Sequence, residues 1–247
     1  MMNVLCVIPA RYQSSRMPGK PLSDLCGKPM IWWVYQEAVK SRLLADVVVA
    51  ADDERIVDRC RELEMNVLMT SKKHDTPTSR LAEIAEIYDF ELYLMIMGDE
   101  PLIDHRCIEL IIPSAVTSSY VAALTNEINN PAEVVDYSNQ KVVTNQNRKA
   151  LMISRSPIPY PKGELGFVYE KVTGVQIFTK KALEFYKAAK KSVVEMAEEN
   201  DLLRFIENGI EVTMIKSPYK TVSVDTPKDL ELVRKEIERR QGQSCHQ

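Results

Sequence analysis

Three basic residues lie close together near the start of the chain, at Arg11, Arg16 and Lys20. They follow the apolar run 4–8, which predicts a buried first strand. Small residues separate the cations, and Gly19 lets the backbone approach a ligand closely. Cations on a loop at the carboxyl end of a parallel strand can bind a polyphosphate. The alternative is a solvated basic surface loop, against which the prolines and small residues directly after a core strand argue. No Walker motif G-x-x-x-x-G-K-[ST] occurs in the chain.

Two aspartates have the surroundings of magnesium ligands. Asp99 follows the apolar run 92–97 in the sequence Gly-Asp-Glu-Pro, and Asp225 follows 222–224 ahead of Thr-Pro. Magnesium takes few protein carboxylates and otherwise keeps water and phosphate oxygens. The alternatives are an ordinary turn carboxylate at Asp99 and a helix cap at Asp225. We expect Glu100 to support the loop rather than to bind metal.

Alternating strands and helices position these groups. The first half predicts strands at 3–8, 46–51, 66–69 and 92–97 and helices at 30–41, 54–64, 78–88 and 104–114. Strands joined through helices imply a doubly wound α/β sheet with parallel pairing. Ligands bind such sheets beyond the carboxyl ends of the strands. We therefore expect one active site where four polar segments converge, namely 11–20, Asp52-Asp53, Thr70-Ser71 and Asp99-Glu100.

The second half predicts shorter strands and a series of helices. The strands are at 121–125, 140–144, 150–155, 172–178 and 212–215, and the helices at 181–190, 194–207 and 228–240. Neither a repeat nor a linker is evident. These patterns predict a single domain over 1–240 and a polar tail over 241–247.

The composition limits the possible partners. The chain has 247 residues, 27% of them charged, and a formal net charge of −3. This balance gives no general attraction to nucleic acid or to an anionic membrane, so the basic loop points to a small anionic ligand. No run reaches the ~20 apolar residues of a membrane span, and we expect neither a signal peptide nor a membrane partner. The five cysteines are odd in number and widely spaced, which predicts a cytoplasmic protein without a zinc site.

The basic loop resembles that of the CMP-Kdo synthetases (3-deoxy-manno-octulosonate cytidylyltransferases), whose pattern is I-P-A-R-Y-x-S-T-R-L-P-G-K-P-L. Here Ser15 replaces Thr and Met17 replaces Leu. The resemblance continues in family order over nearly the whole chain, at 27–31, 51–56, 69–71, 98–103, 141–143, 154–159 and 224–231.

The resemblance implies a single nucleotidyltransferase domain with a mixed, mostly parallel sheet and a small β-rich portion, about 125–180, that forms a homodimer. It implies Mg²⁺-dependent transfer of CMP from CTP to a small acidic sugar, with release of pyrophosphate, in surface polysaccharide synthesis. Asp99 and Asp225 match the metal ligands, and Arg11 and Lys20 match residues that hold the β- and γ-phosphates, so these four are the catalytic candidates. The nucleotide-binding candidates are Pro9, Ala10, Arg11, Ser14, Arg16, Lys20, Thr70, Thr78, Arg80 and Gly98.

Several positions depart from the family pattern, and they cluster where the family faces the acid sugar. This chain has Met97 and Leu202 where the family pattern has Gln, Val172 where it has His, and Gln176 where it has Tyr. It also has Pro77 where the family motif S-G-T has Gly. We expect Met97, Arg155, Gln176 and Leu202 to contact the acceptor. Losing several hydrogen-bonding groups predicts an acceptor other than unmodified Kdo, such as a modified 2-keto acid sugar or a small phosphate or phosphonate.

The sequence leaves alternatives for the roles of 52–54 and Arg80 and for the class of function. We expect Asp52, Asp53 and Glu54 to cap a helix without chemistry, and Arg80 has the alternative of a solvated helix position. A sugar-phosphate pyrophosphorylase is one alternative, although its G-x-G-T-R loop is absent. A non-catalytic nucleotide-binding protein is another, and the retained Lys20 and aspartates argue against it. A nucleic-acid-binding role has no support, because the basic residues of the sequence do not form a stripe interspersed with aromatic residues.

Overall fold

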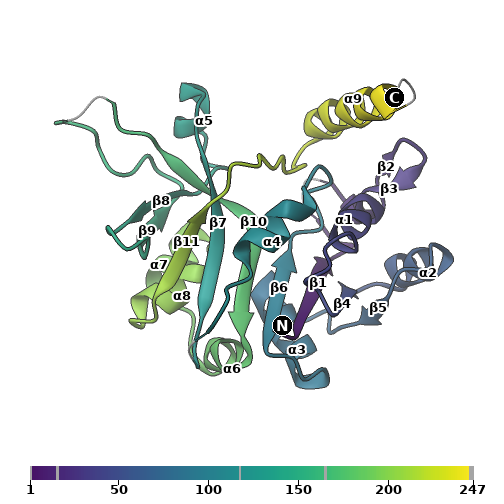
Figure 1. The fold of residues 1–247 in the computed structure, drawn as a ribbon, viewed down its shortest axis with the longest axis horizontal. Helices are drawn as coiled ribbons and strands as arrows, with labels where there is room; N and C mark the ends of the chain where they lie inside the picture. Colours follow the sequence, from purple (N-terminus) through teal and green to yellow (C-terminus); the bar gives the residue numbers. More distant parts are fainter. Residues whose placement is uncertain (1, 15–16, 117, 164–165, 245–247) are drawn as a thin grey trace.

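The computed structural model describes residues 2–14, 17–116, 118–163 and 166–244. Its main element is a nine-stranded sheet (Figure 1). Seven strands follow the order β11-β7-β10-β6-β1-β4-β5. Their bounds are β1 Val4–Ala10, β4 Asp46–Ala51, β5 Val67–Met69, β6 Leu92–Ile96, β7 Val121–Glu127, β10 Glu170–Thr179 and β11 Val212–Lys216.

The sheet is mixed and mostly parallel, as predicted. β1 pairs in parallel with β4 and β6, placing Cys6 beside Val47 and Leu94. β4–β5 and β7–β11 are also parallel. β10 runs antiparallel to both of its neighbours, β6 and β7. The carboxyl ends of β1, β4, β5 and β6 therefore meet at one edge, together with the amino-terminal end of β10.

Helices cover both faces of the sheet because the side chains of β1 alternate between two cores. Cys6 and Ile8 pack with α1 (Met30–Ala38), α2 (Glu54–Glu62) and α4 (His105–Ile111). Leu5 and Val7 pack with α3 (Pro77–Ile87), α6 (Lys180–Ala188) and α8 (Leu202–Glu207). The doubly wound architecture is thus confirmed.

Two helix predictions need correction. The helix predicted over 194–207 is two helices, α7 (Val193–Glu198) and α8, because Glu199 is left-handed at φ 48°. The last helix, α9, spans Pro227–Ser244 and so continues past Arg240, where we expected it to end. Its apolar residues Val233 and Ile237 pack against Leu25 and Met30, near the small hairpin of β2 (Asp24–Leu25) and β3 (Lys28–Pro29).

The β-rich portion adds two strands beside the main path of the sheet. β8 (Lys141–Thr144) and β9 (Ala150–Ser154) form an antiparallel pair, and β8 also pairs with β10. The short helix α5 (Pro131–Val135) precedes them in the chain. It lies above the sheet at the top of Figure 1, where α9 also lies. Of the described helices, none has the length and apolar character to cross a membrane.

Candidate active site

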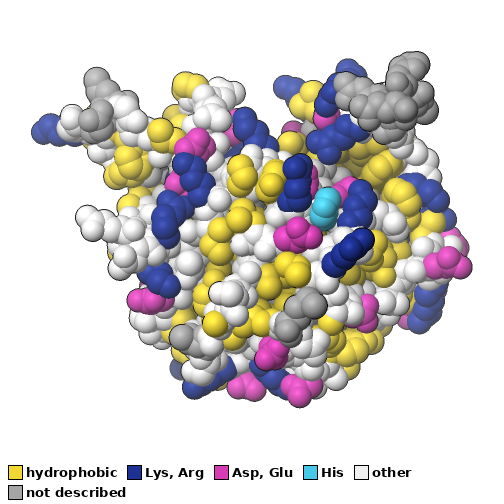
Figure 2. All heavy atoms as spheres, in the orientation of Figure 1, with side chains coloured by type: hydrophobic (Ala, Val, Ile, Leu, Met, Phe, Trp, Pro, Cys, Tyr) yellow, Lys and Arg dark blue, Asp and Glu magenta, His cyan; other side chains and the backbone are white. Residues whose placement is uncertain are grey.

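A cavity of about 1560 Å³ opens at the carboxyl edge of the parallel strands. Its lining comes from the loop after β1, the turn after β6, β10, the α5 region and the start of α9. Figure 2 shows the molecule hollowed between the α5 side and the α9 side. Pockets for one small ligand measure roughly 300–1,000 Å³. The volume therefore accommodates a nucleotide together with a second small molecule.

Lys20 brings the two predicted metal ligands together. Its Nζ lies 2.6 Å from Asp99 Oδ2 and 3.2 Å from Asp225 Oδ1. Lys20 begins the short 3₁₀ helix η1 (Lys20–Leu22), and the preceding Gly19 is left-handed at φ 71°. Asp99 follows β6, and Gly98 lies so close to the end of β1 that an added Cβ would be 3.0 Å from Pro9 O. One cation and two carboxylates from three distant segments thus meet at the cavity.

The cap of α9 comes from Thr226 and Asp229, which corrects the reading of Asp225 as the capping residue. Asp229 Oδ2 accepts hydrogen bonds from the Asp225 N–H at 3.1 Å and the Thr226 N–H at 2.8 Å. Thr226 Oγ1 in turn accepts from the Asp229 N–H at 3.3 Å. This reciprocal arrangement satisfies the start of the helix, so the Asp225 carboxylate faces Lys20 instead.

Arg80 is buried rather than solvated, because Asp52 and Thr70 hold its guanidinium. Arg80 Nη2 donates to Asp52 Oδ2 at 3.1 Å, and Nη1 donates to Thr70 Oγ1. Asp52 also accepts the Tyr12 N–H at 2.9 Å. Burial lowers the pKa of Arg80, and the Asp52 carboxylate opposes that shift. Asp53 alone provides the side-chain cap of α2, so the expectation that Asp52 only caps that helix is wrong.

Glu100 supports the floor of the cavity, as predicted. Its side chain is buried, and Oε1 accepts from Ser223 Oγ at 2.7 Å and from the Gly174 N–H at 3.2 Å. Burial is the main cause that raises the pKa of Glu100, and the neighbouring Asp99 adds to it. The packing is tight, because a Cβ added at Gly174 would lie 2.8 Å from both Glu100 Oε1 and Met97 Cβ.

Most of the predicted site residues line the cavity. They are Pro9, Ala10, Arg11, Ser14, Lys20, Arg80, Met97, Gly98, Asp99, Arg155, Gln176 and Asp225. Thr70, Thr78 and Leu202 are buried and lie outside this lining. Thr70 acts on Arg80, and Leu202 belongs to the core beneath α8. Arg16 lies outside the described residues.

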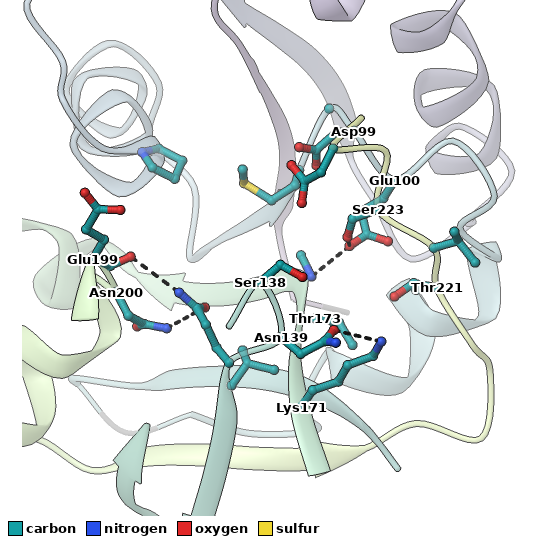
Figure 3. A pocket seen from close by; sticks show the side chains of 18 of the residues that line it. Asp99, Glu100, Ser138, Asn139, Lys171, Thr173, Glu199, Asn200, Thr221 and Ser223 are labelled. Carbon is teal, nitrogen blue, oxygen red and sulfur yellow. Dashed lines mark hydrogen bonds between the residues drawn. The ribbon is translucent and has the colours of Figure 1, made fainter. Parts of the chain in front are cut away.

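The side of the cavity opposite Asp99 is formed by residues that the sequence analysis did not predict as site residues. Figure 3 shows Asp99 on one side of the pocket and Ser138, Asn139 and Lys171 on the other. Lys171 Nζ donates to Asn139 Oδ1 at 3.1 Å. Two buried polar atoms beside this wall, Thr173 Oγ1 and Gln176 Oε1, have no hydrogen-bond partner in the part of the chain that the structure describes. The pairing of β8 with β10 brings these segments together; the polar character of 136–140 was the one signal in the sequence.

Comparisons with known proteins agree with this geometry. A cytidylyltransferase family model matches residues 5–234. The 3-deoxy-manno-octulosonate cytidylyltransferase of Geobacter sulfurreducens is 34% identical over 96% of this chain and 100% of the relative. The Escherichia coli enzyme of that name is 37% identical over 95% of this chain and 96% of the relative.

Solved structures support the same group. A CMP:2-keto-3-deoxy-manno-octonic acid synthetase complexed with CTP superposes with a TM-score of 0.89 at 37% identity, covering 96% of this chain and 99% of that one. The inositol-1-phosphate CTP transferase of T. maritima, at 14% identity and a TM-score of 0.70 over 95% of this chain and 94% of that one, shares the fold. The chain therefore belongs to the cytidylyltransferase family, within the group of the CMP-Kdo synthetases, and is a nucleotidyltransferase.

Proposed function

We propose that this enzyme transfers CMP from CTP to the hydroxyl of a small acidic sugar and releases pyrophosphate. The observation that carries the proposal is the meeting of Lys20, Asp99 and Asp225 at the edge of a cavity with room for two ligands. The relatives' names and the CTP complex of a similar structure support CTP as the donor.

The donor set fits a magnesium ion. Asp99 and Asp225 offer carboxylate oxygens that converge on one point, now bridged by the Lys20 ammonium. Among the described residues no cluster of three or more potential ligands occurs, so phosphate oxygens and water would complete the coordination, as magnesium prefers. The chemistry that bound Mg²⁺ supplies is neutralisation of charge on the phosphate oxygens.

The chain's own residues bind and orient the substrates. Arg11 and Lys20 hold the triphosphate, while Gly98 lets the turn that carries Asp99 pack closely against the end of β1. Asp52 fixes Arg80 against the nucleotide side of the cavity. The acceptor hydroxyl attacks the α-phosphorus in line; the new O–P bond forms as the bond to pyrophosphate breaks, and the hydroxyl proton passes to water. Positioning and charge stabilisation supply the catalysis.

The acceptor differs from unmodified Kdo in this proposal. Met97 and Gln176 line the cavity where the family pattern has Gln and Tyr. The buried Gln176 Oε1 and Thr173 Oγ1 have no hydrogen-bond partner among the described residues, and buried polar atoms normally bind something. Gln176 Oε1 can only accept, so it suits an acceptor with hydroxyl or N–H donors, whereas the ionised group of a simple phosphate or phosphonate brings none. Together with the altered side chains at Met97 and Gln176, this favours a modified 2-keto acid sugar over a simple phosphate or phosphonate.

Pyrophosphate release tests this function. Purified protein is assayed with Mg²⁺, each of the four nucleoside triphosphates, and acceptors that include Kdo, amino- or deoxy-substituted 2-keto acid sugars, sugar 1-phosphates and simple phosphonates. We expect release with CTP and a modified acid sugar, and loss of release with EDTA. Efficient turnover of Kdo would agree with the cytidylyltransferase activity but contradict the proposal that the acceptor differs from Kdo. CTP binding without any turnover would support a non-catalytic nucleotide-binding protein.

We further propose that the β-rich portion forms a homodimer. Large apolar side chains on β9 and the following loop are exposed, with Leu151 at 57%, Tyr160 at 85% and Val168 at 51%. Such side chains in one region are typical of an interaction surface. Light scattering after size-exclusion chromatography is expected to give twice the 28.2 kDa chain mass. A monomer at micromolar concentration would contradict this part of the proposal.

A further inference from the structure

Lys141 is a fully buried cation that has no carboxylate in hydrogen-bond contact among the described residues. It begins β8 and has 0% exposed surface. Its Nζ donates to three backbone carbonyl oxygens, those of Asp136 at 2.9 Å, Asn139 at 2.6 Å and Arg155. An ammonium group has three donors, so every one of them is used.

The three carbonyls belong to segments whose side chains line the cavity. Asp136 and Asn139 belong to the turn 136–140, all of whose residues line the cavity. Arg155 follows β9 and also lines the cavity. We call residues 136–140 the acceptor wall. This wall lies opposite Asp99 (Figure 3). Lys141 thus joins the acceptor wall to the Arg155 segment through one buried group.

Other contacts also hold the acceptor wall, among them the bond from Lys171 Nζ to Asn139 Oδ1, but Lys141 is the group that joins it to the Arg155 carbonyl. Arg155 Nη1 donates to Tyr137 O at 3.0 Å. The Gln140 side chain accepts from Asn200 Nδ2 at 2.8 Å, and the Gln140 carbonyl accepts from the Val172 N–H at 2.9 Å. These bonds connect the wall to β10 and to the break between α7 and α8.

The positive charge of Lys141 matters for this arrangement. A neutral amine has only two N–H donors, so one carbonyl would face a lone pair. Burial lowers the pKa of Lys141, whereas the nearby Asp136 and Glu198 carboxylates raise it. Replacing the side chain by an apolar one removes this donor from all three carbonyls, of which the Asp136 carbonyl keeps the Asn139 N–H at 3.2 Å, and an unsatisfied buried acceptor is costly. The 136–140 turn would then leave its present position.

We propose that Lys141 is a positioning residue for the acceptor, because its buried ammonium fixes the acceptor wall and Arg155 at the distance from Asp99 that the acceptor must span. The inference rests on the proposed function, in which the acceptor occupies this end of the cavity. Lys141 touches neither substrate. It acts through the backbone of residues that line the cavity.

Lys141→Ala tests the proposal, with Lys141→Met as a second variant that preserves the side-chain volume. Lys149→Met is the matched control, since Lys149 lies on the same hairpin and donates to Thr213 outside the cavity. We expect KM for the best acceptor of the turnover panel to rise at least about tenfold in both Lys141 variants, with the Kd for CTP within twofold of the unmodified protein. Methylammonium, which fits the space of the lost ammonium, is expected to restore much of the acceptor KM in Lys141→Ala but not in Lys141→Met.

An unchanged acceptor KM in both folded variants overturns the proposal, as does an equal loss of CTP and acceptor binding, which would indicate a general structural role. If the unmodified protein turns over no acceptor, the proposed function fails and amide hydrogen exchange decides the role of Lys141. Faster exchange confined to 137–140 and 155–156, reversed by methylammonium, supports the positioning role. Exchange that is unchanged, or that rises throughout the sheet, overturns it.

Discussion

The Lys20 ammonium lies 2.6 Å from Asp99 Oδ2, although 79 positions separate the two residues in the chain. Their side chains are only 13% and 21% exposed. Water screens such a pair less than it screens a surface ion pair. Lys20 therefore has two roles in the proposed reaction, since it holds the aspartates together in the free enzyme and presents its charge to the triphosphate when CTP binds.

Lys20→Met removes that charge. We expect kcat to fall by about 100-fold or more, the loss typical when one group that stabilises transition-state charge is removed. Pyrophosphate release at saturating CTP measures it. Lys40→Met, which removes an exposed cation paired with Glu37, is the control and is expected to leave kcat unchanged. If the Lys20→Met enzyme kept its activity, the triphosphate would not bind at Lys20 and the prediction would be wrong.

Asp52→Asn weakens the support of Arg80. The amide can still accept from the Tyr12 N–H, but it has no charge to offer the Arg80 guanidinium. A hydrogen bond to a charged group is worth about 1.5–3 kcal/mol, so KM for CTP is expected to rise roughly tenfold or more while KM for the acceptor changes little.

Asp53→Asn provides the comparison for that variant. Asp53 caps α2 and pairs with the exposed Arg55, and its substitution is expected to leave both KM values unchanged. Equal effects of the two substitutions on KM for CTP would show that Asp52 acts through the helix rather than through Arg80.

Gly174→Ala disturbs the floor of the cavity. The new Cβ would lie 2.8 Å from Glu100 Oε1 and Met97 Cβ, and overpacking typically costs about 1–3 kcal/mol. We expect the free energy of unfolding to fall by about that amount and activity to drop, because Glu100 adjoins Asp99. Gly163→Ala, where no described residue comes within 4 Å of the added atom, is expected to be neutral in urea unfolding. Full stability and activity of Gly174→Ala would show that the Glu100 loop yields easily.

Glu195→Gln breaks a buried ion pair that joins α7 to α8. Arg204 donates to both Glu195 oxygens, at 2.6 and 2.8 Å, and the side chains are 7% and 4% exposed. Removing one partner of such a pair costs about 3–5 kcal/mol, which urea unfolding would detect. Glu62→Gln, at an exposed pair with Arg59, is expected to change the free energy of unfolding by less than about 1 kcal/mol. A similar small effect at Glu195 would mean that Arg204 finds another partner.

Residues 194–207 show why local patterns predicted the helices better than their ends. Apolar periodicity continues through the segment, so it predicted one helix. The structure divides it at Glu199 because Asn200 Oδ1 accepts the Leu202 N–H at 2.9 Å and starts α8 afresh. Side-chain bonds of this kind compete with the helical hydrogen bonds, and periodicity does not register them.

The sequence by itself determined the alternation of strands and helices, the basic loop with Lys20, and the aspartates at the ends of their segments. Each depends on residues adjacent in the chain, so period, turn chemistry and motif order are sufficient to find it. Only the tertiary structure decided that Asp52 supports Arg80, that Thr226 and Asp229 leave Asp225 facing Lys20, and that Lys141 fixes the acceptor wall. These roles depend on partners from separate strands and loops, and the packing of the whole sheet sets which partner a buried polar group meets.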